Sequence, residues 1–174
     1  MAALTHNHLA GPQTRYGILA AVATALMDQL VKLWLVFGFN LPAKEPVHLT
    51  PFLDLVMAWN TGISYGLFQH QGPLGQWILL AVKAIAVALL VLWLARARTQ
   101  TAAVALGLII GGAIGNGIDR LTYGAVVDFV LFHVEIAGWS FKWYVFNLAD
   151  TAIVAGVAGL LYESFQRERA AKAP

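Results

Sequence analysis

Cysteine is absent from this 174-residue chain, and charged residues are scarce. Without cysteine there is no disulfide framework, thiolate nucleophile or zinc–thiolate site, so cysteine proteases are excluded. Asp, Glu, Lys and Arg make up only 11% of the residues, whereas about 25% is usual in a soluble domain. Hydrophobic residues reach 59%, which is typical of a membrane protein. The sequence also lacks internal repeats and low-complexity linkers, so one compact unit is expected.

Four long apolar runs are present, and each is long enough to cross a bilayer as a helix, which takes about 20 residues. We therefore expect an all-α integral membrane protein with a single membrane domain over residues 1–174. The expected transmembrane helices cover residues 16–37, 74–94, 101–117 and 146–165. A cleavable signal peptide is a competing interpretation of the first run, because small residues follow an arginine there. The apolar pattern continues to Phe37, which favours a retained helix.

Basic residues flank one set of helix ends, and the positive-inside rule predicts that these ends and both termini are cytoplasmic. The residues are Arg15, Arg96, Arg98, Arg167, Arg169 and Lys172. The segments 38–73 and 118–145 would then face the opposite compartment. Both contain aromatic residues of the kind expected near a membrane interface, including Trp59, Trp139, Trp143 and Tyr144.

Two aspartates lie at the edges of apolar stretches, where ionised groups are expensive and are therefore functional candidates. Asp128 interrupts the apolar stretch 126–130, and Asp150 lies at the start of the last run. Two carboxylates held close together cannot both ionise, so such a pair can act as acid and base. Two structural alternatives are a solvent-facing strand position for Asp128 and a capping box that joins Asn147 to Asp150.

Further polar residues lie within the runs. Asp28 and Lys32 are four residues apart and share one helix face, where they can neutralise each other. This pair either only stabilises the helix or also organises a nearby site, and the stem of Lys32 could instead snorkel to the interface. Asn116, Asp119 and Arg120 lie within about one turn at the end of the third run. Arg120 either pairs with Asp119 or holds a carbonyl or lipid oxygen.

These residues, with Asn60 and Gly62, resemble the five motif blocks of bacterial lipoprotein signal peptidases, also called signal peptidase II. The blocks are Asp28-Gln29-x-x-Lys32, Asn60-x-Gly62, Gly111-Gly112-Ala-x-Gly115-Asn116-x-x-Asp119-Arg120, Val127-Asp128-Phe129 and Phe146-Asn147-x-Ala149-Asp150. The match follows the family in order and spacing and leaves out only the two tails and the second helix. There is one departure: after Gly62 the family usually has two alanines and an aromatic residue, where this chain has Ile63-Ser64-Tyr65.

The resemblance implies a bacterial inner-membrane aspartyl endopeptidase with four transmembrane helices, cytoplasmic termini and an active site near the extracytoplasmic face. It also implies a small extracytoplasmic β-cradle between the first and second helices, resting on the membrane. The substrate would be a diacylglyceryl-modified prolipoprotein, cut before the lipidated cysteine. Membrane lipid would be a further partner, whereas no nucleic acid, cofactor or metal is expected. Cyclic peptide antibiotics such as globomycin would inhibit the enzyme.

The resemblance also assigns roles by motif position. The catalytic pair would be Asp128 and Asp150; the substrate-binding residues would be Asn60, Gly62, Asn116, Arg120 and Asn147; the supporting residues would be Asp28, Lys32 and Asp119. One ionised aspartate would take a proton from the attacking water, while its protonated partner donates to the scissile carbonyl oxygen. Four apolar neighbours of the pair are expected to disfavour its doubly ionised state: Val126, Val127, Phe129 and Phe146.

Two other classes of function compete with this interpretation. A small proton- or ion-coupled membrane transporter would use Asp28, Lys32, Asp128 and Asp150 as a relay. A relay distributes polar groups across the bilayer, whereas a protease places both aspartates near one face. A non-enzymatic assembly factor would offer a glycine face to partner helices, but it leaves the acidic pair unexplained. That face consists of Gly107, Gly111 and Gly115.

Overall fold

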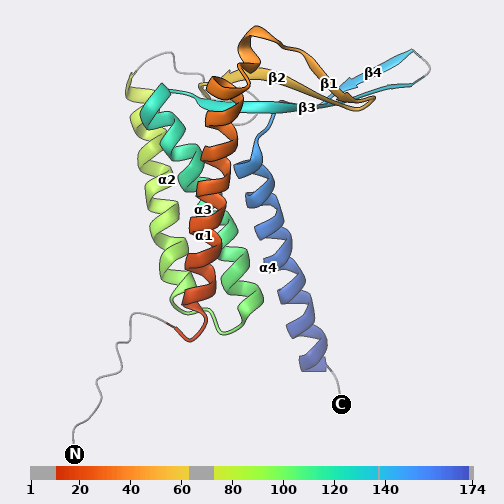
Figure 1. Cartoon of the computed structure of the whole chain (residues 1–174). Helices are drawn as coiled ribbons and strands as arrows, with labels where there is room; N and C mark the ends of the chain where they lie inside the picture. The colour runs from red at the N-terminus through yellow and green to blue at the C-terminus, as the bar shows by residue number, and fades with distance from the viewer. Residues whose placement is uncertain (1–10, 63–72, 137, 173–174) are drawn as a thin grey trace, which may run out of the picture.

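The computed structural model describes residues 11–62, 73–136 and 138–172. Within these residues, four long helices stand side by side and a four-stranded antiparallel sheet lies across one end of them (Figure 1). The helices are α1 (Thr14–Leu33), α2 (Pro73–Leu94), α3 (Gln100–Tyr123) and α4 (Leu148–Lys172). The strands are β1 (Val47–Thr50), β2 (Leu53–Asn60), β3 (Val126–Ile136) and β4 (Trp139–Lys142). A π-helical turn, Trp34–Gly38, extends α1 toward the sheet.

The central helix is α3, which contacts each of the other three. Its glycines Gly107, Gly111 and Gly115 face α1, where an added methyl group would collide with the α1 backbone or with the carboxylate of Asp28. Small residues let two helix backbones approach closely. The predicted glycine face is therefore occupied within the chain itself, which leaves the assembly-factor interpretation without a free surface there.

The end of α3 lies further along the chain than expected, because the helix continues to Tyr123 rather than stopping at residue 117. Three polar side chains of its last turns bond to other elements, namely Asn116, Asp119 and Arg120. It ends at Gly124, which has a φ of 72°. Glycine adopts this left-handed conformation readily and commonly terminates helices. Much of the expected loop 118–145 is thus helix and strand.

The bounds of α4 also differ from the expected 146–165. Phe146 forms a β-bridge with Val130, so the backbone is still extended there and the helix starts at Leu148. At the other end the helix continues to Lys172, beyond the apolar run. Its last turns carry ion pairs four residues apart, including one between Glu163 and Arg167 at 2.6 Å, which support an exposed helix.

The sheet has the order β1-β2-β3-β4, and each neighbouring pair is antiparallel. The cradle expected between the first and second helices therefore supplies only half of this sheet. The first two strands come from that segment, whereas β3 and β4 come from the segment between α3 and α4. Pairing between β2 and β3 satisfies backbone groups that an isolated hairpin would leave exposed at its edge.

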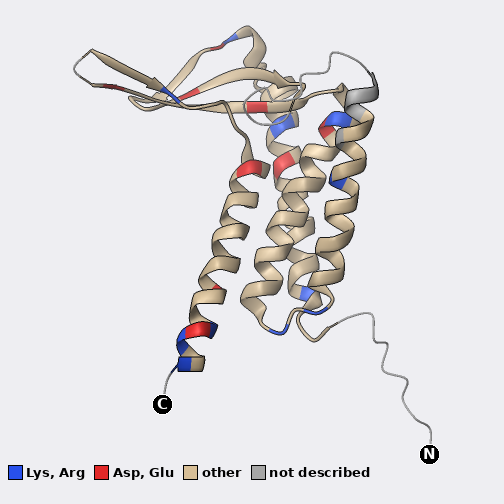
Figure 2. Ribbon diagram, turned by 180° about the vertical axis from the view of Figure 1, so that it is seen from behind, with Lys and Arg blue, Asp and Glu red and all other residues tan. Residues whose placement is uncertain are grey.

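Three helical segments are long and apolar enough to cross a membrane: Thr14–Gly38, Gln100–Tyr123 and Leu148–Lys172. Within the described residues α2 contributes a shorter apolar stretch, Leu80–Leu94. The outer faces of the helices expose large apolar side chains, for example Leu19 at 66% and Ile85 at 62%. Such surfaces are unfavourable in water and suit a lipid environment. Most charged residues gather toward the two ends of the helices (Figure 2).

Candidate active site

Asp128 lies on β3 beside the end of β2. The register pairs Ala58 with Asp128 and Asn60 with Val126. Because alternate residues of a strand share a face, Asn60, Val126 and Asp128 point to the same side, where all three line a cavity. Asp128 is only 2% exposed, so the solvent-facing strand position considered for it is wrong.

Phe129 lies on the opposite face of the same strand. It packs into an apolar cluster with Leu35 and Leu41, both of which are buried. Phe129, one of the four apolar neighbours expected to desolvate the acidic pair, therefore does not border the cavity, because strand alternation turns its ring away. Val126, two residues before Asp128, is the apolar neighbour that lines the cavity.

Asp150 and Asn147 form the capping box predicted as one alternative. The backbone N–H of Asn147 donates to Oδ2 of Asp150 at 3.3 Å, and the backbone N–H of Asp150 donates to Oδ1 of Asn147 at 2.9 Å. The capping interaction does not exclude a chemical role, because Asp150 also lines the cavity. Its other carboxylate oxygen, Oδ1, accepts a hydrogen bond from Nδ2 of Asn116 at 2.9 Å. The cap thus fixes this carboxylate at the start of α4.

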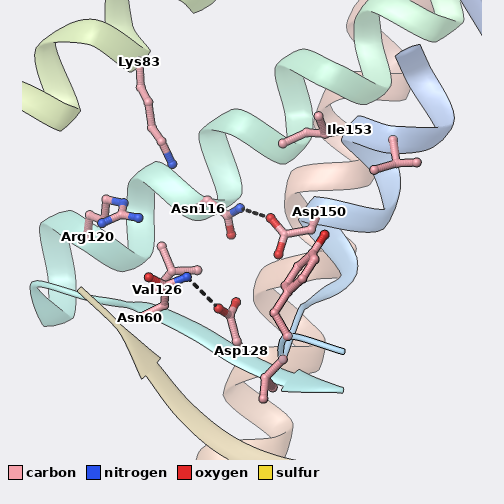
Figure 3. A pocket seen from close by; sticks show the side chains of 11 residues that line it. Asn60, Lys83, Asn116, Arg120, Val126, Asp128, Asp150 and Ile153 are labelled. Carbon is pink, nitrogen blue, oxygen red and sulfur yellow. Dashed lines mark hydrogen bonds between the residues drawn. The ribbon is translucent and has the colours of Figure 1, made fainter. Parts of the chain in front are cut away.

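Asparagine side chains join the two carboxylates into one network. Asn147 Nδ2 donates to Asp128 Oδ1 at 2.6 Å and to Asn116 Oδ1 at 3.0 Å. Asn60 Nδ2 donates to the other oxygen of Asp128 at 3.0 Å. Figure 3 shows Asp128 and Asp150 on the same side of the cavity, each held by an amide. The structure therefore brings together five of the residues that the sequence grouped.

Burial raises the pKa of Asp128 to about 6. The hydrogen bonds from Asn60 and Asn147 favour the ionised form and oppose this rise, while the nearby carboxylate of Asp150 adds to it. A carboxyl group with a pKa near neutrality can hold or release a proton under physiological conditions. This is the property that acid–base chemistry at the cavity requires.

Lys32 supports the site from α1. Its ammonium group is buried and lies 2.8 Å from Asp28 and 2.7 Å from Asp119. It also donates to Oδ1 of Asn116 at 3.0 Å. Snorkelling of Lys32 to the interface is therefore wrong, because three oxygen acceptors surround the ammonium group inside the protein. Since Asn116 in turn holds Asp150, the ion pair extends to the site rather than only stabilising α1.

Asp119 and Arg120 do not form the simple pair considered as one alternative. Asp119 accepts hydrogen bonds from Gln29 at 2.8 Å and from the backbone N–H of Val127 at 3.1 Å, in addition to Lys32. Neighbouring residues of a helix point about 100° apart. Arg120 consequently points elsewhere, and its Nη2 donates to the carbonyl oxygen of Gly62 at 2.7 Å.

The remaining donors of Arg120, Nε and Nη1, are buried and have no hydrogen-bond partner among the described residues. The residue lines the cavity and is only 5% exposed. Buried donors without partners are unfavourable, so these groups favour binding of an oxygen-bearing ligand. The segment Ile63-Ser64-Tyr65, where the sequence departs from the family pattern, lies outside the described residues.

Two residues of this region are missing from the sequence-based site. Gln29 bridges Asp119 and the carbonyl oxygen of Gly115. Lys83 is the only charged residue of α2, and it lines the cavity. No motif block falls on the second helix, so the resemblance passed over Lys83. A sequence signal did exist, since a lysine within an apolar run is itself a functional candidate.

The cavity has a volume of 260 Å³, with acidic and basic residues on different elements. Asp128 and Asp150 come from β3 and α4, whereas Lys83 and Arg120 come from α2 and α3 (Figure 3). Among the described residues no group of three or more histidines and carboxylates is arranged to hold a metal ion. The arrangement suits acid–base chemistry on a ligand rich in oxygen atoms.

The family model described as Signal peptidase (SPase) II matches residues 20–166. The chain belongs to the signal peptidase II family. The lipoprotein signal peptidase of Nitrobacter hamburgensis is 64% identical over 92% of this chain and 98% of the relative. That of Rhodopseudomonas palustris (strain TIE-1) is 61% identical over the same shares. A solved structure of a bacterial membrane enzyme is 26% identical, with a TM-score of 0.72 over 90% of this chain and 91% of the other.

Family membership and the apolar helices together identify a multi-pass membrane peptidase. The transporter alternative has no support from these comparisons. The placement of charge argues against it as well, because the four residues proposed for a relay belong to one hydrogen-bonded cluster rather than being distributed along the helices.

Proposed function

We propose that this signal peptidase II is an aspartyl endopeptidase that removes the signal peptide from diacylglyceryl-modified prolipoproteins by cutting before the lipidated cysteine. Its relatives are lipoprotein signal peptidases along nearly their whole length. The observation that carries the aspartyl mechanism is the joint placement of Asp128 and Asp150 in one cavity, linked through Asn147 and Asn116. No other pair of carboxylates among the residues lining this cavity is available.

In this mechanism the two carboxyl groups share one proton, because like charges held close together disfavour double ionisation. The ionised aspartate removes a proton from a water molecule as that water attacks the scissile carbonyl carbon. The protonated partner donates to the carbonyl oxygen, and the tetrahedral intermediate then releases the amine of the cysteine. The substrate would be bound by Asn60, Gly62, Asn116, Arg120 and Asn147. These residues would be held in place by Asp28, Lys32 and Asp119.

We further propose that the chain is a single membrane domain in which all four helices cross the bacterial inner membrane. The helix ends opposite the sheet carry Arg15, Arg96, Arg98, Arg167, Arg169 and Lys172, which the positive-inside rule assigns to the cytoplasm. The sheet lies across the other end of the helices (Figure 2) and would, with the cavity, be at the extracytoplasmic face. Exposed aromatic residues such as Trp139 would contact the membrane interface. A lipidated cysteine keeps its acyl chains in the bilayer, so the bond before it is presented at this depth.

A cleavage assay with the purified protein in lipid tests the proposed function. The substrates are one prolipoprotein with the diacylglyceryl group and its unlipidated twin, with products identified by mass spectrometry. We expect cleavage of the lipidated form alone, before the modified cysteine, and suppression by globomycin. Activity should persist in a metal chelator, and zinc-dependent recovery after chelation would contradict the metal-free mechanism. Equal cleavage of the unlipidated twin would overturn the proposed substrate class.

The pH dependence of kcat/KM is expected to follow the protonation of the pair. The active form carries one proton, and Asp128 has a pKa of about 6, so the descending limb should begin near pH 6. Asn60→Leu removes a donor that stabilises ionised Asp128. This raises the pKa of Asp128 further, so the descending limb should move to higher pH even though the rate also falls. A limb that stays in place or moves to lower pH would contradict this.

Arg120→Lys is expected to lower kcat/KM by about tenfold or more, although the charge is retained. The planar guanidinium donates to Gly62 and still presents other donors to the cavity. A single ammonium group cannot span both positions. The matched control is Arg15→Lys at the opposite end of the molecule, which should behave like the parent enzyme. If Arg120→Lys has normal activity, Arg120 does not bind the substrate and only holds the carbonyl group of Gly62.

A further inference from the structure

Lys83 is not one of the charged residues that the family resemblance assigns to the site. It is the one charged residue in α2, and Figure 3 shows its side chain reaching from that helix toward Asn116 and the cavity. No ion pair or hydrogen bond joins it to any described residue, in contrast to Lys32, which has three oxygen partners. An ammonium group in an apolar helix is costly unless an oxygen acceptor binds it.

The charges that act on Lys83 come from α1, α3, α4 and β3. Its ammonium group interacts electrostatically with the carboxylates Asp150 and Asp128 and with the cations Arg120 and Lys32. Both carboxylates already accept hydrogen bonds from asparagine amides. Lys83 is therefore close enough to influence the acidic pair, while its own donors are directed to the space in which a ligand would lie.

Peptide hydrolysis creates a new anion in that space. Oxygen from water bonds to the scissile carbonyl carbon, the C–N bond breaks, and the cysteine amine leaves with a proton. The signal peptide is left with a terminal carboxylate on the carbon that was attacked, so this group forms next to Asp128 and Asp150. Like charges in a buried site repel each other strongly, and a cation facing them offsets that repulsion.

We propose that Lys83 is a substrate-binding residue that holds the carboxylate formed at the C-terminus of the signal peptide. This role rests on the proposed function. Lys83 lines the cavity from α2 together with Asp128 of β3 and Asp150 of α4. Arg120, with two unpartnered donors among the described residues, is the second cation of the same wall.

Product inhibition tests the role of Lys83. A synthetic signal peptide ending in a free carboxylate and the same peptide ending in an amide are each titrated into the cleavage assay with the lipidated prolipoprotein. The unmodified enzyme should bind the carboxylate form on the order of tenfold more tightly, the effect of one charge-assisted hydrogen bond. Lys83→Met should abolish most of this preference, and Lys83→Arg should retain it.

Lys142→Met is the matched control, because Lys142 is exposed on β4 outside the cavity. It should leave the preference unchanged. The ratio of the two inhibition constants is measured within each variant, so a general loss of activity or stability cannot mimic the expected result. If the unmodified enzyme cleaves the lipidated substrate but Lys83→Met keeps the full preference, the role of Lys83 is overturned while the proposed function stands. Failure of the unmodified enzyme to cleave that substrate overturns both.

Discussion

Asp128→Asn and Asp150→Asn are each expected to lower the cleavage rate of a lipidated prolipoprotein by about 10³-fold, within the range for loss of a general acid or base. Asparagine has nearly the shape of aspartate, but it can neither accept the proton of the attacking water nor donate one to the carbonyl oxygen. Because the two carboxyl groups act as a unit, the double variant should be little worse than either single variant. Initial rates of signal-peptide release measure all three.

The matched control for these variants is Asp54→Asn. Asp54 is also a buried aspartate of the sheet, but it lies outside the cavity and pairs with His48 at 2.8 Å. It should keep most of the activity. Thermal unfolding in detergent establishes that each variant remains folded. Near-normal turnover by Asp128→Asn or Asp150→Asn would remove that residue from the catalytic pair.

Lys32→Met is expected to lower the free energy of unfolding by about 3–5 kcal/mol, the cost of breaking a buried ion pair from one side. The variant leaves Asp28 and Asp119 buried without their shared cation, and Asn116 loses a donor. The amide that holds Asp150 is then less firmly placed, so activity should fall together with stability. Unfolding of the purified variants in detergent, followed by loss of helix signal, measures the change.

Two further variants test whether the lost stability of Lys32→Met comes from the unpaired buried charges: a control at an exposed lysine and a compensating change at the two aspartates. Lys142→Met replaces an exposed lysine and should change the stability by less than about 0.5 kcal/mol. Adding Asp28→Asn and Asp119→Asn to Lys32→Met removes the unpaired charges and should recover part of the lost stability. A Lys32→Met variant as stable as the parent protein would show that the buried triad does not hold α1 and α3 together.

Local features of the sequence were sufficient for several elements. The apolar runs located the four helices to within a few residues at most ends, because apolar residues continue for the length of a span. Asn147 and Asp150 were three residues apart in the pattern of a capping box, and the structure forms both of its hydrogen bonds. The glycine spacing of α3 predicted a packing face, since residues four apart share one side of a helix.

Other features depended on contacts between distant segments. The pairing of β2 with β3 doubled the expected cradle and placed Asn60 beside Asp128, residues 68 positions apart. The directions of Phe129 and Arg120 followed from strand alternation and helix rotation once neighbouring elements were in place. The burial of Lys32 depended on Asp119 and Asn116, which come from α3 rather than α1.

The sequence by itself thus determined the membrane class, the family, the helices and the identity of the two aspartates as candidates, because each of these resides in residue types and short spacings. Only the tertiary structure decided how these residues meet: which amides link the carboxylates, which face of β3 borders the cavity, and that Lys83 of α2 joins it. The physical reason is that hydrogen bonding, burial and charge compensation depend on distances between elements. Local periodicity carries no information on those distances until strand pairing and helix packing fix them.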